Sequence, residues 1–507
     1  MGTEKIWISD VVGDDYKNWL PGEWIGFDAG TGTGKTTFIF KTLAACRENG
    51  EQILYLCNRV DLREQTETTV KAEGLAGTII IRSYQKLEDQ IRASKNNAMD
   101  FVKRFRYVFA DECHYFFADS HMNPYTELSW NLLRSNNTST IIWASATART
   151  FFDLPVDAGK IAKNHIYRVE KDYSYVDGLV FYRKDQLRPL INKILAEEED
   201  SKILVFVNSE KRMRELHSFY EGQADFYCSQ NNNPLKQICS PDAVKDCSFE
   251  HRILFATSAM DNGIDIKDKR VRHIFSELVD IDSLAQSLGR KRNDPDDETD
   301  RCTFYVREWN GQEINCFNNI NAAKLGEAVM YEKDRERFWR FHEHDRNVFK
   351  NNPIFFVTKD GDSEKVRINR VALFKAQMNE AMYSAMKSNG YINTVKDYLG
   401  DYFSDKLVIS DIQPSGDLLI EYLHGIEGKK LYKPEITDLK EKFRTAMTIR
   451  KKPTRHLGIH TLNGWLEDNY SGKNRYPLRL KSYKDNCRVL PDGSVNQKRG
   501  EHYWVLE

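Results

Sequence analysis

Several features that mark whole classes of protein are absent from this sequence of 507 residues. Its nine cysteines include no Cys-x-x-Cys pair, so we expect neither a zinc site nor a disulfide framework. No stretch approaches eighteen consecutive apolar residues, so we expect no membrane-spanning helix. The start, MGTEKIWISDVVGDD, lacks a basic segment followed by an apolar run and does not resemble a signal peptide. These absences predict a cytoplasmic chain with reduced thiols and no membrane partner.

An excess of charge of one sign is also missing. The chain has 74 Lys and Arg against 75 Asp and Glu, so its total charge gives no indication of a nucleic-acid partner. Any such site must be local, and residues 441–507 are the candidate, with fourteen Lys and Arg against seven Asp and Glu. With 40% hydrophobic residues the chain is predicted to be globular, and its length suggests about three domains.

Short apolar runs alternate with helix-like segments over the first 310 residues. In the first half, the runs rich in β-branched and aromatic residues predict strands at 24–29, 53–57, 78–81, 107–111 and 140–145. The pattern restarts after residue 178 and predicts strands at 202–207, 252–257, 271–276 and 303–308. Because helix-like segments separate the strands, each half is predicted to be a parallel sheet with helices on both faces.

The expected fold is therefore α/β, with two tandem lobes and a mixed, mostly helical C-terminal accessory region. The predicted divisions are a first lobe, a connector, a second lobe, a helical accessory region and a basic C-terminal module, at residues 1–150, 151–178, 179–310, 311–440 and 441–507.

A glycine-rich segment follows the first predicted strand and opens a predicted helix. Its sequence is AxxGxGKT, in which Ala29 replaces the first glycine of the general phosphate-loop pattern. Glycines let backbone N–H groups turn inward around phosphates, and the helix N-terminus adds its dipole. Lys35 is expected to reach the β and γ phosphates, and Thr36 to offer its hydroxyl to magnesium. The predicted ATP-binding residues here are Gly30, Thr31, Gly32, Thr33, Gly34, Lys35, Thr36 and Thr37.

Two carboxylates end the predicted strand at 107–111, within the sequence DECH. Asp111 is expected to hold the magnesium shell, and Glu112 to act as the general base that polarises the attacking water. His114 would couple the site to the next motif. An Asp-Glu pair at a strand end is by itself usually a solvated loop, but its position 76 residues after Lys35 favours the catalytic interpretation.

Further short motifs follow in an order that resembles the DExH branch of superfamily 2 helicases, over about residues 20–310. They are Asn58–Gln65, Ser83–Gln85, Ser145–Thr147, Phe206–Ser209, Thr257–Ile266 and Gln286–Arg292. The resemblance implies two RecA-like P-loop lobes that clamp ATP and Mg²⁺ between them and work on nucleic acid.

The resemblance also implies residue roles. Ser145 and Thr147 would link hydrolysis to lobe movement, and Gly263 and Asp265 would bind ATP, Asp265 through the ribose. The second lobe would complete the catalytic site with Gln286, Arg290 and Arg292. Nucleic-acid contacts would come from Asn58, Arg59, Ser83, Tyr84, Asn208, Ser209 and Thr257.

The sequence departs from the helicase pattern in two places. Asn293 stands where many helicases have the last arginine of QxxGRxxR, so Arg292 is taken as the second arginine, as in the RIG-I-like and Dicer helicases. No glutamine motif precedes the phosphate loop, which argues against the DEAD-box RNA helicases. Adenine would instead stack on Tyr16, Trp19 or Trp24, although packing is the commoner role of such residues.

The basic C-terminal module predicts a helix, a basic segment, a turn at Pro491-Asp492-Gly493 and a final strand. Helices followed by a hairpin would form a winged-helix-like module that brings Lys481, Lys484 and Arg499 to nucleic acid. A solvated basic face is an equal alternative.

Together these features predict an ATP-dependent helicase or translocase, with DNA favoured over RNA. One alternative is an initiator or sensor ATPase that binds a specific site through its C-terminal region, as in the origin-binding helicases of viruses and phages. Another is a protein-translocating motor on the same two lobes. That motor would need a large insertion in the first lobe, and the compact interval from Lys35 to Ser145 argues against it.

Overall fold

The computed structural model describes most of the chain. The described residues are 6–30, 32–46, 50–58, 60–120, 123–147, 152, 161, 165–207, 209–228, 233–257, 260, 264–294, 296–342, 352–360, 363–412, 416–447, 457–469, 478–489 and 494–507. They divide into two compact units, and each is described by itself. One unit comprises residues 1–181 and 200–408, and the other comprises 182–199 and 409–507.

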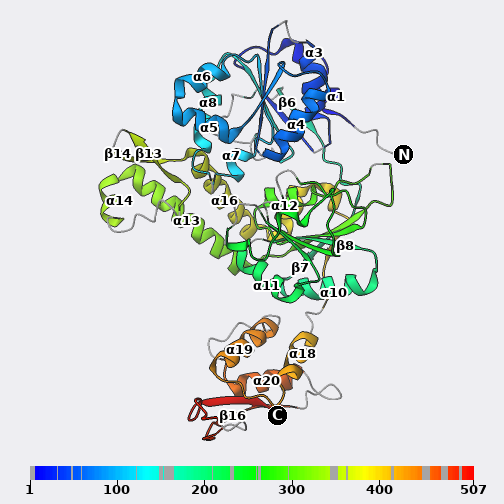
Figure 1. Cartoon of the computed structure of the whole chain (residues 1–507), viewed down its shortest axis with the longest axis vertical. Coiled ribbons are helices and arrows are strands. Elements are labelled where there is room, and N and C mark those ends of the chain that lie inside the picture. Colours follow the sequence, from blue (N-terminus) through cyan, green and yellow to red (C-terminus); the bar gives the residue numbers. More distant parts are fainter. Residues whose placement is uncertain are drawn as a thin grey trace. The chain divides into compact units, whose positions relative to one another are not determined.

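A six-stranded sheet forms the first lobe, with strand order β3-β2-β4-β5-β1-β6 and parallel pairing throughout. Its strands are β1 (Trp24–Ala29), β2 (Ile53–Cys57), β3 (Ile79–Ser83), β4 (Tyr107–Ala110), β5 (Thr140–Ser145) and β6 (Ile166–Val169). Figure 1 shows helices on both sides of this sheet. They are α1 (Ile8–Val12), α2 (Lys35–Thr37), a π-helical segment (Phe38–Leu43), α3 (Ala44–Cys46), α4 (Val60–Ala72), α5 (Tyr84–Ala93), α6 (Lys95–Val102), α7 (Tyr115–Ala118) and α8 (Thr126–Ser135).

Burial on both faces explains why these strands are apolar along their whole length. Successive residues of a strand point to opposite faces, and here they enter two separate clusters. Tyr55 and Phe109 pack on one side of the sheet, and Leu54 and Val108 pack on the other. The sheet therefore sits between two apolar layers, as a parallel sheet requires.

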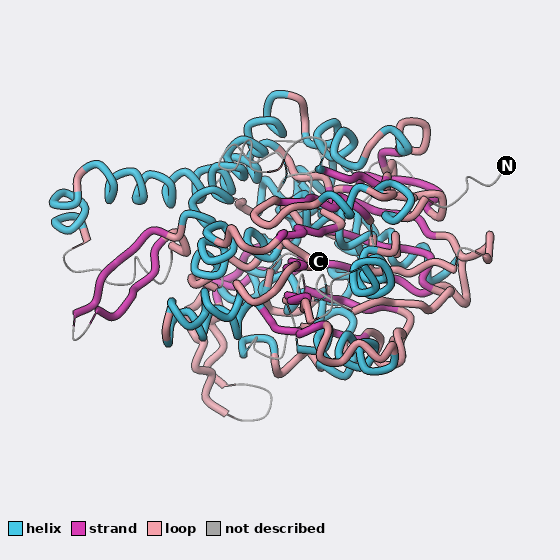
Figure 2. The backbone as a smooth tube through the Cα atoms, turned by 90° about the horizontal axis from the view of Figure 1, so that it is seen from above, coloured by secondary structure: helices cyan, strands magenta, loops and turns pink. Residues whose placement is uncertain are grey.

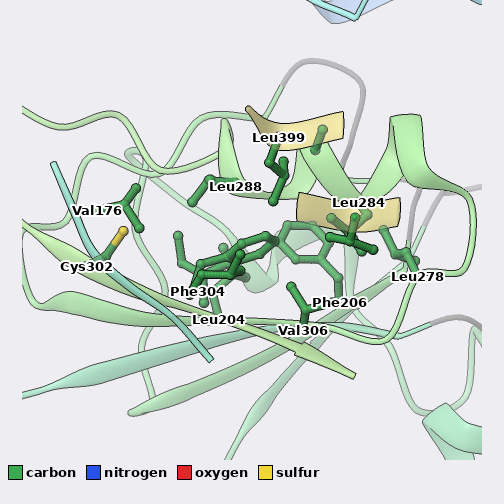
Figure 3. Close-up of a cluster of buried hydrophobic side chains, with 14 of the residues drawn as sticks. Val176, Leu204, Phe206, Leu278, Leu284, Leu288, Cys302, Phe304, Val306 and Leu399 are labelled. Carbon is green, nitrogen blue, oxygen red and sulfur yellow. The ribbon is translucent and has the colours of Figure 1, made fainter. Parts of the chain in front are cut away.

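The second lobe is a seven-stranded sheet with order β15-β7-β12-β11-β8-β10-β9. Its strands are β7 (Val176–Tyr182), β8 (Lys202–Val207), β9 (Asp225–Tyr227), β10 (Ile253–Thr257), β11 (Val271–Ser276), β12 (Cys302–Arg307) and β15 (Leu407–Ile409), with α11 (Glu210–Tyr220) and α12 (Ile281–Leu288) beside them. Figure 3 shows Leu284 and Leu288 of α12 lying over Leu204 and Phe304 of the sheet. This packing fixes the buried face of α12. The two parallel-sheet lobes confirm the predicted α/β fold of tandem RecA-like lobes.

Two of the predicted divisions can be compared with the elements of the structure. Residues 151–178, expected to be only a connector, supply β6 to the first sheet and the start of β7 to the second, because β6 pairs with the edge of β1. The C-terminal unit begins at residue 409 rather than 441, because β15 returns the chain to the second sheet just before it.

Between β12 and β15 the chain forms two long antiparallel helices and a hairpin. The elements are α13 (Gly311–Lys333), α14 (Arg335–Phe341), β13 (Phe355–Asp360), β14 (Ser363–Ile368), α16 (Arg370–Ser388) and α17 (Tyr391–Leu399). The region expected to be helical, 311–440, contains α13, α14, α16 and α17 among its described residues, but the β13–β14 hairpin was not predicted. In Figure 2 this hairpin and the neighbouring helices extend away from the sheets. Asn321 donates to the Ala376 carbonyl at 2.7 Å and ties α13 to α16.

The second compact unit consists of α10 and, from α18 onward, a helix, a short bridge strand, two helices and a hairpin. Its elements are α10 (Leu187–Glu197), α18 (Gly416–Ile426), α19 (Lys433–Met447), α20 (Ile459–Asn469), β16 (Leu480–Lys484) and β17 (His502–Leu506). Leu431, between α18 and α19, forms an antiparallel bridge to Trp504, which makes a third strand position beside the β16–β17 pair. Among the described residues, no helix is long and apolar enough to cross a membrane.

Candidate ATP site

The glycine-rich loop joins β1 to α2 at the carboxyl edge of the first sheet. Gly32 and Gly34 have φ of 75° and 83°, a region that favours glycine, so the loop can turn its backbone N–H groups inward. Lys35 is buried, and its Nζ donates to the carbonyls of Ala29 and Gly30 at 2.8 Å each. Burial lowers the pKa of Lys35, whereas the carboxylates of the acidic box oppose that shift. The lysine is thus held against the backbone of the glycine-rich loop.

The other predicted residues of the loop lie around this lysine. Thr33 donates through its hydroxyl to the Gly30 carbonyl at 2.7 Å. Thr36 is half-buried and Thr37 is exposed, whereas Thr31 lies outside the described residues.

Asp111 lies at the end of β4 and is held by two tyrosines. Its carboxylate accepts from the Tyr55 hydroxyl and, at 3.0 Å, from the Glu112 N–H, and its carbonyl accepts from the Tyr84 hydroxyl at 2.8 Å. Burial, aided by the charge of Glu112, raises the pKa of the Asp111 carboxyl to about 6. A buried carboxylate of this kind gains from a cation beside it.

The pKa of Glu112 is shifted in the opposite direction to that of Asp111. Burial raises the pKa of its carboxyl, but the hydrogen bond and charge of His114, with Lys35 and Arg290, outweigh burial and bring the pKa to about 2. Glu112 has φ of 49°, one of three non-glycine residues with positive φ in the described part of the chain. Such strain is often found at functional sites. Glu112 is therefore an ionised carboxylate in a strained position.

A chain of polar contacts runs from Glu112 to the second lobe. His114 Nδ1 lies 3.2 Å from Glu112 Oε2 and 2.9 Å from Ser145 Oγ. The Ser145 hydroxyl accepts from the Thr147 N–H at 3.0 Å, and Gln286 Nε2 donates to Thr147 Oγ1 at 2.7 Å. The residues that the sequence places in three separate motifs thus form one continuous contact path across the two lobes.

Arg290 and Arg292 approach this site from the second lobe. Arg292 Nη2 pairs with Asp265 at 2.9 Å, and Arg290 Nη1 lies 3.8 Å from the same carboxylate. The intervening Lys291 is buried in an ion pair with Asp300. The charge of Arg290 lowers the pKa of the Glu112 carboxyl, and the charge of Arg292 lowers the pKa of Lys35. Both arginines therefore interact electrostatically with the first-lobe site.

Oxygen donors for a magnesium ion meet at the ends of β1 and β4. The Tyr55 hydroxyl contacts both the Asp111 carboxylate and the Thr36 side chain, so these two groups lie close together. A hydroxyl and a carboxylate are hard oxygen ligands, which Mg²⁺ prefers while keeping several waters. The predicted pair, Thr36 and Asp111, fits the ion that ATP normally brings.

Tyr55 was not predicted as a site residue. Its sequence signal was only a hydroxyl within the otherwise apolar run ILYLC, and its role depends on β2 lying next to β4.

The three aromatic residues proposed to stack on adenine are core residues instead. Tyr16, Trp19 and Trp24 are each at most 9% exposed, because they fill the first-lobe clusters on both sides of the sheet. The exposed aromatic at the loop is Trp7, which is 42% exposed, and an added Cβ on Gly34 would lie 3.0 Å from its ring. The Ile8 N–H donates to the Thr33 carbonyl at 2.9 Å and fixes this segment to the loop. No sequence pattern marks Trp7 as a site residue.

The predicted nucleic-acid contacts in the first lobe lie mostly inside it, and Tyr84 is the most buried of them. Its ring is fully buried and stacks on Tyr115 at 4.6 Å, so its role is to support Asp111. Ser83 is also buried, and its hydroxyl caps α5 by accepting from the Lys86 N–H. Asn58 is buried and accepts from Gln85 at 2.9 Å.

The remaining predicted contacts have mixed positions. Ser209 is exposed and caps α11, and Thr257 is half-buried at the end of β10. Lys481, Lys484 and Arg499 are exposed in the second compact unit, and Lys481 lies 3.3 Å from Glu507. The predicted residues outside the described part of the chain are Arg59, Asn208 and Gly263.

Comparison with known proteins gives two family matches. Residues 23–150 match the family described as "Type III restriction enzyme, res subunit", and residues 185–292 match "Helicase conserved C-terminal domain". No curated protein matches the chain.

Similar solved structures include S. cerevisiae Dbp5 bound to RNA and ADP BeF3, with 12% identity, a TM-score of 0.39, and coverage of 60% of this chain and 83% of that chain. Another is a DEAD box protein from the hyperthermophile Methanococcus jannaschii, with 17% identity, a TM-score of 0.33, and coverage of 62% and 89%. Similarity at this level does not bear on function.

The two family matches fall on the elements that build the site. The first spans β1 to β5, with the glycine-rich loop and the acidic box, and the second ends at Arg292. The chain therefore has one segment that matches the restriction-enzyme res subunit family and one that matches the helicase C-terminal domain, which together support an ATP-dependent helicase or translocase of nucleic acid in general.

Proposed function

We propose that the protein hydrolyses ATP in the cleft between its lobes and uses the cycle to move along nucleic acid. The contact path from Glu112 through His114, Ser145 and Thr147 to Gln286 carries this proposal. It joins the general base to the helix that leads to the arginines. A change in the nucleotide can therefore be transmitted to the second lobe.

Each part of the site has a distinct task in this mechanism. Lys35 and the loop N–H groups hold the phosphates, and Arg290 and Arg292 stabilise charge on the γ-phosphate as the lobes close. Mg²⁺, held by Thr36 and Asp111, would neutralise phosphate charge when bound. Glu112 takes a proton from the attacking water, and His114 holds its carboxylate in place.

Asp265 was predicted to contact the ribose of ATP. It pairs with both arginines. We propose that Asp265 holds the arginines side by side before ATP arrives and then yields them to the γ-phosphate. We also propose that DECH is a DExH box and that the arginines form a QxxGRxR motif.

We expect Glu112→Gln to retain ATP binding but to lower kcat by roughly 10²–10⁴-fold, the usual contribution of a general base. The amide cannot accept the proton of the water, whereas Asp111 and Lys35 remain. Steady-state hydrolysis together with binding of a fluorescent ATP analogue would measure both effects.

The matched control is Glu73→Gln, which makes the same carboxylate-to-carboxamide change at an exposed residue of the same lobe. It should behave as the wild type. Wild-type turnover by Glu112→Gln would assign the base to another residue.

The polymer that this motor works on is best identified by its effect on ATP hydrolysis. Wild-type rates should be compared side by side with single-stranded DNA, duplex DNA, single-stranded RNA and no polymer. We expect at least one polymer to stimulate hydrolysis, with DNA the stronger. No stimulation by any of them would remove nucleic acid from the mechanism.

A second candidate function is an initiator or sensor ATPase that binds duplex through its C-terminal unit. It is favoured by the helix–strand–helix–helix–hairpin order of residues 416–507, which is the order of a winged helix. Asn463 of α20 exchanges two hydrogen bonds of 2.9 Å with the Leu480 backbone and fixes that helix against β16. Helix α20 would then be the element presented to the major groove.

We expect replacement of Lys481, Lys484 and Arg499 by Ala to weaken nucleic-acid binding without changing basal ATP hydrolysis. All three are exposed in a unit that is separate from the ATP site. For every phosphate that is no longer neutralised, the slope of log affinity against log salt should flatten by roughly one. Binding measured over a salt series tests this.

The control is a triple Ala variant of Lys71, Lys103 and Arg104. The last two precede β4, and Lys71 ends α4, so they lie near the opposite edge of the first sheet from the site. An unchanged slope in the Lys481, Lys484 and Arg499 variant would make this basic face a solvated surface.

A further inference from the structure

Helix α16 contacts both lobes. Its first half carries Val371, Phe374 and Met378 into the apolar cluster of the first lobe, and its second half carries Met382 and Met386 into that of the second. The spacing of these residues places them along one side of the helix. Figure 1 shows α16 near α7 and α12, at the junction of the two lobes.

The first-lobe end of α16 is held beside the acidic box. Asn369 caps the helix and donates from Nδ2 to Thr126 Oγ1 at 3.2 Å, and the Arg370 N–H donates to Glu127 at 2.9 Å. Phe374 lies 5.9 Å from Phe117 of α7, the short helix that directly follows DECH. The start of α16 is therefore fixed to elements that adjoin the general base.

The same helix contacts α12 through Lys375, the residue that follows Phe374. Lys375 Nζ lies 2.6 Å from Asp280 and 3.5 Å from Asp282. Asp280 is the N-cap of α12 and accepts from the Ser283 N–H, whereas Asp282 also accepts from the Tyr398 hydroxyl of α17. The Lys375 side chain is only 17% exposed, so this ion pair is partly shielded from water. Shielding makes such a pair stronger than one on the surface.

Helix α12 carries Gln286 and leads directly to Arg290 and Arg292. Its other side is fixed to the second sheet by Leu284 and Leu288. The ion pair at its N-terminus is thus the point where an element anchored on the first lobe sets its position.

We propose that α16 is a strut that sets the position of α12 relative to the acidic box, and that Lys375 is a positioning residue for Gln286 and the two arginines. This inference rests on the proposed function, because it assigns the arginines to the γ-phosphate. In this scheme Lys375 contacts neither ATP nor the attacking water molecule. Its effect is on how often the arginines reach the phosphates.

The test is a double-mutant cycle of Lys375→Met and Asp280→Asn. Methionine keeps the length of the side chain without its charge, and asparagine keeps the capping oxygen without its charge. We expect each single change to lower kcat about tenfold, which corresponds to about 1.4 kcal/mol, and to leave the ATP dissociation constant unchanged because the phosphate loop is intact. The double variant should be no slower than either single variant.

The matched control is Lys387→Met, an exposed lysine on the last turn of the same helix, which should hydrolyse ATP as the wild type does. Lys375→Arg should restore much of the rate because it keeps the charge. If Lys375→Met shows no cooperative thermal unfolding transition, Lys375→Arg and Asp280→Asn still test the proposal.

A wild-type kcat in Lys375→Met, a raised kcat, or additive losses in the double variant would each overturn the strut. A loss of ATP affinity equal to the loss of kcat would show a general structural role and would also overturn it. The proposed function is judged separately, because Arg290→Ala must be inactive for that function to hold, whatever Lys375 does. If the wild type hydrolyses no ATP, both proposals fail.

Discussion

Lys35→Ala should reduce ATP hydrolysis to the level of a reaction without enzyme. The lysine is the cation that neutralises the β and γ phosphates, and it is already held at the loop by the carbonyls of Ala29 and Gly30. Its loss also removes a positive charge that interacts with both Asp111 and Glu112. We therefore expect weak nucleotide binding as well as no turnover, measured by phosphate release and by binding of a fluorescent ATP analogue.

Two comparisons make this result specific. Lys41→Ala removes an exposed lysine from the helix that Lys35 opens, and it should leave hydrolysis unchanged. Thermal unfolding of Lys35→Ala should remain cooperative, because the methyl side chain leaves no unpaired charge in the loop. Hydrolysis at the wild-type rate by Lys35→Ala would refute the phosphate-loop assignment.

The strands of both lobes were predictable because burial on two faces requires apolar residues along the whole strand. β1, β2 and β5 begin and end where the apolar runs do. In contrast, β6 and β9 are four and three residues long, too short to show a period. The β13–β14 hairpin packs Phe355, Val366 and Ile368 against a small cluster formed with α13, α14 and α16, a tertiary contact that its short strands do not reveal in sequence.

The residues proposed for the site could be found from sequence where each of them lies in its own motif. The glycine-rich loop, DECH and the arginine segment could be found in this way, whereas Tyr55, Trp7 and Lys375 could not. Tyr55 reaches Asp111 only because β2 and β4 are neighbours in the sheet, and Lys375 reaches Asp280 across 95 residues of chain. The burial of Tyr84 beside Asp111 could not be predicted for the same reason, since it depends on tertiary packing that no local motif reports.

Arg290→Ala and Arg292→Ala should each lower kcat by at least about 10³-fold, whereas Asn293→Ala should have little effect. The charges of the two arginines act on Glu112 and Lys35, respectively, and in the proposed mechanism both arginines face the γ-phosphate. Lys291 points the other way, into its ion pair with Asp300. By the alternation of an extended segment, Asn293 shares the side of Lys291 and not that of the arginines.

The measurement that separates these residues is kcat at saturating ATP and nucleic acid, with the ATP dissociation constant measured alongside. Loss of an arginine that acts on the transition state lowers kcat and leaves most of the binding that the phosphate loop provides. Arg292→Lys should remain severely impaired, because an ammonium cannot reproduce the planar two-pronged contact of a guanidinium. Arg290 is buried, so its variant also requires an intact unfolding transition before its kcat is interpreted. A severe defect in Asn293→Ala combined with a silent Arg292→Ala would instead restore the longer QxxGRxxR spacing and place the second phosphate contact at residue 293.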